Sequence, residues 1–316
     1  MGLLILQFIL SAVAICVAGS LLTKFADKIA AETGLGHMMI GGVVLASATA
    51  LPELLVDFEA VELDLPDLAV GDLLGSSIFN LLMLSILDFS FPSTFRRTAF
   101  SPIFSNHSLA AVLSIFLTAI VGMGILSRIT TSILGIGIFA WFLPLIYFFG
   151  LKLIYSERKI QAAKNGERIR ISLVDLLRRR SLTLSLFGCV LSTAIILISA
   201  PSLVRTTDEI TQYSGLGYSF IGTTLLAMIT SLPEFVSTLT AFRMGAPDLA
   251  LGLIIGSNTF NMLLFLPLDL IYPKVLFSSV QNIHAITAFC IIAIMSIAVM
   301  GQLYHAKKRP RFSAPS

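Results

Sequence analysis

Long apolar stretches separated by short polar ones dominate the chain. A helix that crosses a bilayer needs about 20 mostly apolar residues, and nine segments fit that length. We expect an all-α membrane protein of about nine transmembrane helices, with eight and ten as the nearest alternatives. The predicted spans are 3–22, 37–60, 67–87, 107–126, 130–152, 183–201, 217–241, 248–268 and 283–303.

The composition supports this class. Hydrophobic residues make up 56% of the 316 positions and charged residues 12%, about half the usual ~25%. A soluble chain of this length needs more polar surface. The composition excludes an ordinary soluble enzyme, a disordered chain and a nucleic-acid-binding protein, despite the net charge of +3.

Basic residues predict the orientation. With nine spans, 18 of the 21 Lys and Arg residues fall on one side of the membrane. Such residues concentrate on the cytoplasmic side. We therefore expect a first membrane half at 1–152, a basic cytoplasmic loop at 153–182, and a second half at 183–316 that ends in a basic cytoplasmic tail. The N-terminus is expected outside, and the membrane is expected to be the cytoplasmic (inner) one.

An internal repeat lies within these halves. Residues 35–88 align with 216–269 without a gap at an offset of 181, with 23 identities in 54 positions. The matches include Pro, Glu, Asp, Gly, Ser and Asn, so shared apolar composition does not explain them. The first copy starts inside and the second starts outside. Inverted repeats of this kind are typical of transporters, whose site lies near mid-membrane between the copies.

Each copy carries a Pro-Glu pair deep in a predicted span: Pro52 with Glu53, and Pro233 with Glu234. Proline leaves a backbone carbonyl without its helical donor, and in lipid that carbonyl needs another partner. An intramembrane carboxylate is a candidate functional group by default. A threonine stands four residues before each glutamate, on the same helix face.

The helix that follows each pair adds more oxygen atoms. Ser76 and Asn80 share a face in copy one, as do Ser257 and Asn261 in copy two. The glycine before each serine permits close helix approach. An all-oxygen set of carboxylates, hydroxyls and amides suits Ca²⁺ and Na⁺. The set contains no His or Cys, which argues against Zn²⁺ or Cu.

These repeats resemble the alpha-repeats of the calcium/cation antiporter superfamily, the sodium/calcium exchanger type and especially its prokaryotic members. The resemblance implies an exchanger-type fold and exchange of Ca²⁺ through a cluster of ion sites. Carried over by position, Glu53 and Glu234 are the central carboxylates. The implied helpers are Thr49, Ser76 and Asn80 from copy one, Thr230, Ser231, Ser257 and Asn261 from copy two, and the carbonyls of Ala46 and Ala227.

Three departures from the family pattern bear on the transported ions. Ala50 stands where copy two has Ser231, so one hydroxyl is lost. Asn261 stands where some relatives carry Asp, which lowers the charge of the site by one. The chain also has nine predicted spans where ten are typical.

One acidic cluster is not explained by the resemblance. Six acids, Asp57, Glu59, Glu62, Asp64, Asp67 and Asp72, lie near the outer ends of the second and third spans, and only one matching position of copy two is acidic. The cluster would concentrate external cations or form a solvated loop. Asp72 shares a face with Ser76 and Asn80, so we place it on the outer ion path or in proton transfer.

The sequence thus predicts a secondary antiporter that exchanges Ca²⁺ for Na⁺ or H⁺ by alternating access, without a cofactor. Its expected partners are inorganic cations and the lipid bilayer, with no nucleic acid and no protein implied. An exchanger of K⁺, Na⁺ or Mg²⁺ against protons is the alternative, because of Ala50 and Asn261. A channel or a sensory membrane protein fits inverted repeats less well, and no enzyme motif is visible.

Overall fold

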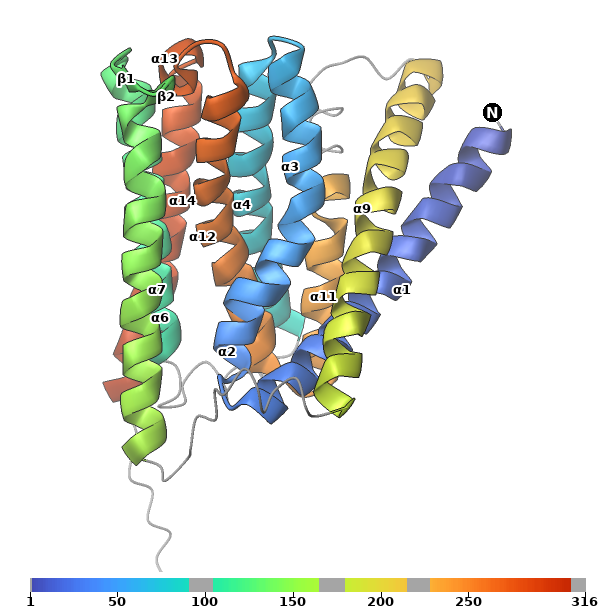
Figure 1. Ribbon diagram of the computed structural model, residues 1–316, viewed down its shortest axis with the longest axis vertical. Coiled ribbons are helices and arrows are strands. Elements are labelled where there is room, and N and C mark those ends of the chain that lie inside the picture. Colours follow the sequence, from blue (N-terminus) through green and yellow to red (C-terminus); the bar gives the residue numbers. More distant parts are fainter. Residues whose placement is uncertain (1, 91–104, 165–179, 215–227, 308–316) are drawn as a thin grey trace, which may run out of the picture.

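A computed structural model describes residues 2–90, 105–164, 180–214 and 228–307 (Figure 1). Apart from a hairpin of two-residue strands, its elements are helices. They are α1 (Gly2–Thr33), α2 (His37–Met39), the π-helical turn η1 (Ile40–Leu45), α3 (Ala46–Glu62), α4 (Pro66–Ser90), α6 (Ser105–Ser127), β1 (Ser132–Ile133), β2 (Ile136–Gly137), α7 (Ile138–Lys164), α9 (Arg180–Ser214), α11 (Leu232–Arg243), α12 (Pro247–Ile271), α13 (Leu276–Ser279) and α14 (Ile283–Lys307).

Eight helices in the described residues are long and apolar enough to cross a membrane. They coincide with eight of the nine predicted spans, which confirms the all-α membrane class. The ninth predicted span, 217–241, falls partly outside the described residues. Its described part is helical from 228 to 230, turns at Ser231 and continues as α11.

The first helix is longer than its apolar run, which was predicted to end at residue 22. The added turns are amphipathic, because Leu22, Ala26, Ile29, Ala30 and Thr33 are buried at helical spacing. Packing therefore extends the helix through a segment that hydropathy alone assigned to a loop. Helix α9 lies along α1, and the two run at an incline to the other helices in Figure 1.

The two repeats run in opposite directions, as predicted. We define the basic end of the bundle as the end where α1 and α7 finish and α9 begins; it lies at the bottom of Figure 1. The first copy (α2, η1 and α3) rises from this end and α4 returns to it. In the second copy α11 descends to the basic end and α12 rises from it.

Two aspartates at matching repeat positions mark this inversion. Asp67 Oδ1 lies 3.0 Å from His284 Nε2, at the start of α14. Asp248 Oδ1 lies 3.5 Å from His107 Nε2, at the start of α6 and at the other end of the bundle. Both aspartates lie in the first turn of their helices. Each also contacts a histidine that begins a neighbouring helix.

Helix α12 crosses η1 with almost no side chains between them. A Cβ atom on Gly256 would lie 2.3 Å from Gly42 Cα, and one on Gly252 would lie 2.6 Å from the Met38 carbonyl oxygen. From the other side, a Cβ atom on Gly41 would lie 2.4 Å from the Leu249 carbonyl oxygen. Small residues spaced four apart permit such backbone contact between membrane helices. This glycine crossing, made by Gly41, Gly42, Gly252 and Gly256, joins the two repeats.

Replacement of Gly256 by alanine is expected to destabilise the fold. The new methyl group meets backbone, which cannot move aside as a flexible side chain can, so the cost is about 1–3 kcal/mol. Thermal unfolding of the purified protein in detergent measures it. Gly301→Ala is the control, because a Cβ atom there meets nothing within 4 Å. Equal melting temperatures for the two variants would contradict the proposed crossing.

Candidate cation site

Two glutamates, one from each repeat, lie together inside the protein. Glu53 is on α3 and Glu234 is in the first turn of α11, and each side chain is 1% exposed. The two carboxylates are within electrostatic range of each other. The sequence predicted both residues, and the fold brings them together from segments 181 positions apart.

The two copies present their glutamates on different local structures. Helix α3 continues through Pro52, with the π-turn η1 just before it. In copy two the helix is interrupted at Ser231, and Pro233 occupies one of the first positions of α11. Proline is favoured there, because the first-turn N–H groups have no helical partner. Glu234 therefore lies at a helix N-terminus, where negative charge is stabilised.

Ser231 links the repeats directly. Its hydroxyl oxygen lies 3.0 Å from Glu53 Oε1 and 2.9 Å from Ser76 Oγ. A serine hydroxyl carries one proton, so Ser231 can donate to the carboxylate while it accepts from Ser76. A second bridge runs from the Thr230 hydroxyl to Asp72 Oδ1, over 3.2 Å. Both bridges join copy two to copy one.

Other predicted residues complete the surroundings. The Asn261 amide lies beside the Glu53 carboxyl, and the Thr49 hydroxyl lies beside the Glu234 carboxyl. The Thr49 hydroxyl donates within its own helix, to the carbonyls of Leu45 (3.1 Å) and Ala46 (3.2 Å). Of the two predicted backbone ligands, Ala46 is buried next to the site, and Ala227 lies outside the described residues.

Several polar atoms of this cluster have no hydrogen-bond partner among the described residues. They are Glu53 Oε2, both carboxylate oxygens of Glu234, Ser257 Oγ, and both side-chain polar atoms of Asn261. Buried polar atoms are ordinarily satisfied, so a group of unsatisfied oxygens is suited to hold a cation. No three His, Cys, Asp or Glu side chains in the described part of the chain form a metal site by themselves. A cation here would depend on two carboxylates and neutral oxygens.

The side-chain nitrogen of Asn80 has a hydrogen-bond partner among the described residues, whereas Asn80 Oδ1 and both polar side-chain atoms of its repeat counterpart Asn261 have none. The Asn80 nitrogen donates to Asn258 Oδ1 over 2.9 Å, and Asn258 Nδ2 donates to the Ser77 carbonyl over 3.2 Å. Sequence reasoning missed Ser77 and Asn258. A signal was present, because these two polar residues occupy the same repeat position.

The acidic cluster divides into two groups. Glu59, Glu62 and Asp64 are exposed and Asp67 is partly exposed, which agrees with a solvated surface. Asp57 and Asp72 are 1% and 6% exposed, so they are part of the interior. The solvated interpretation is therefore wrong for Asp57. Its spacing of four residues from Glu53 was the signal that could have placed it on the same buried face.

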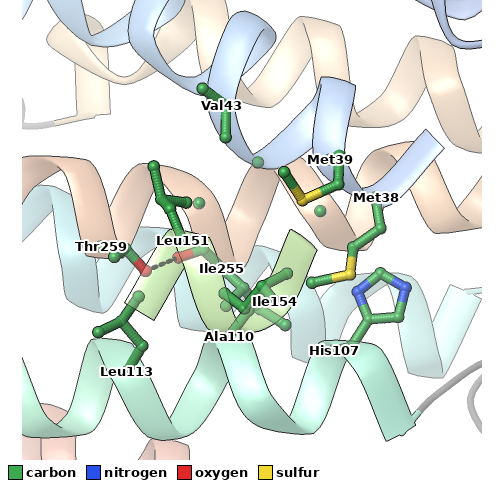
Figure 2. Close-up of a pocket in the computed structure, with 13 residues that line it drawn as sticks. Met38, Met39, Val43, His107, Ala110, Leu113, Leu151, Ile154, Ile255 and Thr259 are labelled. Carbon is green, nitrogen blue, oxygen red and sulfur yellow. Dashed lines mark hydrogen bonds between the residues drawn. The ribbon is translucent and has the colours of Figure 1, made fainter. Parts of the chain in front are cut away.

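A small cavity of about 30 Å³ lies elsewhere, toward the basic end (Figure 2). Its lining comes from α2, η1, α6, α7 and α12 and is mainly apolar, with Met38, Met39 and His107 among the residues drawn. It contains neither glutamate. The candidate cation site is thus defined by converging polar atoms and not by this cavity.

Comparison with known proteins identifies the family to which the chain belongs. The family described as "Sodium/calcium exchanger protein" matches residues 3–151 and 184–313. The chain belongs to this family of membrane exchangers. The match spans both halves and excludes the polar segment between them. The family resemblance predicted from the repeats is confirmed, and the family is one of transporters and not of enzymes.

Individual known proteins are also similar to the chain. Inner membrane protein YrbG of Escherichia coli K12 is 29% identical over 246 residues, which cover 77% of this chain and 72% of the relative. The putative antiporter CaxA of Alkalimonas amylolytica is 28% identical over 238 residues, covering 75% and 71%. Sodium/calcium exchanger MaX1 of Methanosarcina acetivorans is 45% identical over 89 residues, or 28% of this chain and 25% of that one.

The fold matches solved exchanger structures. The sodium-calcium exchanger NCX_Mj, soaked with 100 mM Na⁺ and 10 mM Sr²⁺, aligns with a TM-score of 0.70 and 20% identity, over 96% of this chain and 92% of that one. This likeness confirms the exchanger-type fold with its inverted repeats.

Loss of the Ser231 hydroxyl is expected to weaken the contact between the repeats. Ser231→Ala leaves the buried Glu53 carboxyl without this donor, at a cost of about 1–3 kcal/mol. The melting temperature in cation-free detergent solution measures the effect. Ser185→Ala is the matched control, because that buried hydroxyl donates only within its own helix, to the Ser181 carbonyl. An equal loss in both variants would mean that the inter-repeat bond contributes nothing.

Proposed function

We propose that the protein is a secondary-active antiporter that exchanges Ca²⁺ for Na⁺ or H⁺ across the cytoplasmic membrane. One observation carries the proposal: inverted repeats each contribute a buried glutamate to one cluster, and hydroxyls of one repeat bond to carboxylates of the other. Membership of the exchanger family supports it.

The charge of the cluster explains why exchange is favoured over simple release. Glu53 and Glu234 repel each other in an interior where electrostatic interactions are strong. One Ca²⁺ neutralises the pair, and so do two Na⁺ or two protons. An empty, doubly charged site is costly, so one ion set leaves when another replaces it. The two ion sets share the same oxygens and exclude each other.

The repeat architecture supplies the second requirement, access from each side in turn. In transporters with inverted repeats, one unit rocks against another around a site near mid-membrane. Thr49, Ser76, Asn80 and Ser257 lie on the helices that carry or adjoin the glutamates. We assign them, with Asn261, Thr230, Ser231 and the Ala46 and Ala227 carbonyls, to ion coordination during this cycle.

Two features support a proton-coupled exchanger of K⁺, Na⁺ or Mg²⁺ as the second candidate. Ala50 is fully buried and offers no hydroxyl at the position that matches Ser231. Asn261 is neutral beside Glu53, so the cluster lacks a third carboxylate at this point. Both features make the cluster a weaker site for Ca²⁺, which takes six to eight oxygen ligands, carboxylates among them.

Uptake of Ca²⁺ into everted membrane vesicles tests the proposal, with a Na⁺ or a pH gradient imposed in turn. Glu53→Gln and Glu234→Gln should each reduce gradient-driven uptake to background, because a neutral amide cannot balance the ion charge. Glu59→Gln, an exposed acid on the same helix as Glu53, is the control and should transport normally.

Three results would contradict the antiporter proposal or change its ion. Activity that survives both glutamate substitutions removes the proposed site. Ca²⁺ flux that runs without any counter-ion gradient indicates a channel. Movement of K⁺, Na⁺ or Mg²⁺ against protons, with no Ca²⁺ movement under either gradient, favours the second candidate.

We also propose that the basic end faces the cytoplasm, since Lys and Arg concentrate on that side of membrane proteins. Leu134, in the strand hairpin at the opposite end, is 85% exposed, and Lys159 is exposed near the end of α7. In intact cells a membrane-impermeant maleimide should label Leu134→Cys and leave Lys159→Cys unlabelled. The reverse labelling would invert the proposed orientation. The native cysteines lie within α1, α9 and α14.

A further inference from the structure

Asp57 is a buried carboxylate that the two-glutamate site does not use. It lies on α3, four residues beyond Glu53 in the direction away from the basic end. Four residues of α-helix span about 6 Å. The side chain is 1% exposed, and neither of its oxygens has a hydrogen-bond partner among the described residues.

A second carboxylate, from the neighbouring helix α4, accompanies it. Asp72 accepts a hydrogen bond from the Thr230 hydroxyl at Oδ1, while Oδ2 has no partner among the described residues. Asp57 and Asp72 are within electrostatic range of each other. Two carboxylates and a hydroxyl thus gather from α3, α4 and the segment before α11.

No protein cation in the described residues balances this pair. The ion pairs there involve Asp27, Asp64, Asp67 and Asp248 and leave out Asp57 and Asp72. A buried charge without a partner is strongly unfavourable, so such groups are paired or bind a cation. Carboxylate oxygens are the usual ligands of hard cations such as Ca²⁺.

The repeat distinguishes this aspartate pair from the two glutamates, although the two groups are within electrostatic range of each other. The positions that match Asp57 and Asp72 in copy two are Thr238 and Leu253, and neither carries a charge. The glutamates occur once in each repeat, whereas the two aspartates occur only in the first. Their site therefore has no equivalent on the basic side of the glutamates.

We propose that Asp57 and Asp72, with the Thr230 hydroxyl, form a second binding site for a hard cation, next to the glutamate pair on the side away from the basic end. Binding at this site does not depend on the antiport proposal. The further claim that external cations occupy this site before they reach Glu53 rests on the antiport proposal. A cation held there would also favour inward release of an ion at Glu53, because like charges close to each other in a protein interior repel.

Equilibrium binding of ⁴⁵Ca²⁺ to the purified full-length protein in detergent tests the site. The double variant Asp57→Asn with Asp72→Asn should bind one Ca²⁺ fewer at saturation than the unmodified protein. Glu59→Gln with Glu62→Gln removes the same charge from exposed positions of α3 and should bind as the unmodified protein does. Equal binding by the two double variants would overturn the proposal.

A reciprocal variant separates this proposal from the proposed function. Glu53→Gln with Glu234→Gln should lose binding at the glutamates and retain the aspartate-dependent Ca²⁺. If vesicles show no exchange but binding still depends on the aspartates, the second site stands and the antiport proposal fails. If exchange occurs and the aspartate variant binds normally, the reverse holds.

Thermal unfolding keeps the test decisive if the double variant does not fold. Asp57→Asn alone keeps the shape of the side chain and removes one unbalanced charge. It should melt at a higher temperature than the unmodified protein in cation-free buffer, and Ca²⁺ should raise its melting temperature less. An undiminished Ca²⁺-dependent rise would overturn the proposal.

Discussion

The structure depends on the burial of carboxylates inside a bundle that faces lipid. A charge in such an interior is tolerated only where other polar groups or ions compensate it. Here the compensating groups come from the opposite repeat: Ser231 bonds to Glu53, and Thr230 bonds to Asp72. Packing of the second repeat against the first therefore supplies hydrogen bonds that Glu53 and Asp72 would otherwise lack. The same hydrogen bonds therefore contribute both to the cation site and to the packing of the two repeats.

Much of this arrangement could be predicted from the sequence, because it depends on residue identity and spacing. Long apolar runs identify spanning helices, since bilayer thickness fixes their length. Repetition of Pro-Glu at an offset of 181, with matching Asp-Leu-Ala and Gly-Ser segments, identifies two copies of one unit. An odd number of spans between the copies inverts the second. Glu53 and Glu234 follow as the intramembrane acids common to both copies.

Other features depend on contacts between distant segments and are harder to predict from the sequence. Amphipathic packing extends α1 to Thr33, past the end of its apolar run. Asp57 lies in an acidic stretch that resembles a loop, and its spacing of four residues from Glu53 is a weak signal of the burial that the structure shows. The repeats also differ where their sequences agree: the helix is continuous at Pro52 and interrupted before Pro233. Identical dipeptides thus occupy different places in a helix: the interior of α3 in the first copy and the N-terminus of α11 in the second.

The glycine crossing has a consequence for motion. Where η1 meets α12, backbone touches backbone, and a Cβ atom on Gly256 would overlap Gly42. Pulling these segments apart would leave a gap that no side chain could fill, at a cost that grows with the empty volume. Rotation about the contact opens no such gap. The crossing should therefore resist separation of η1 and α12 more strongly than rotation of one segment about the other.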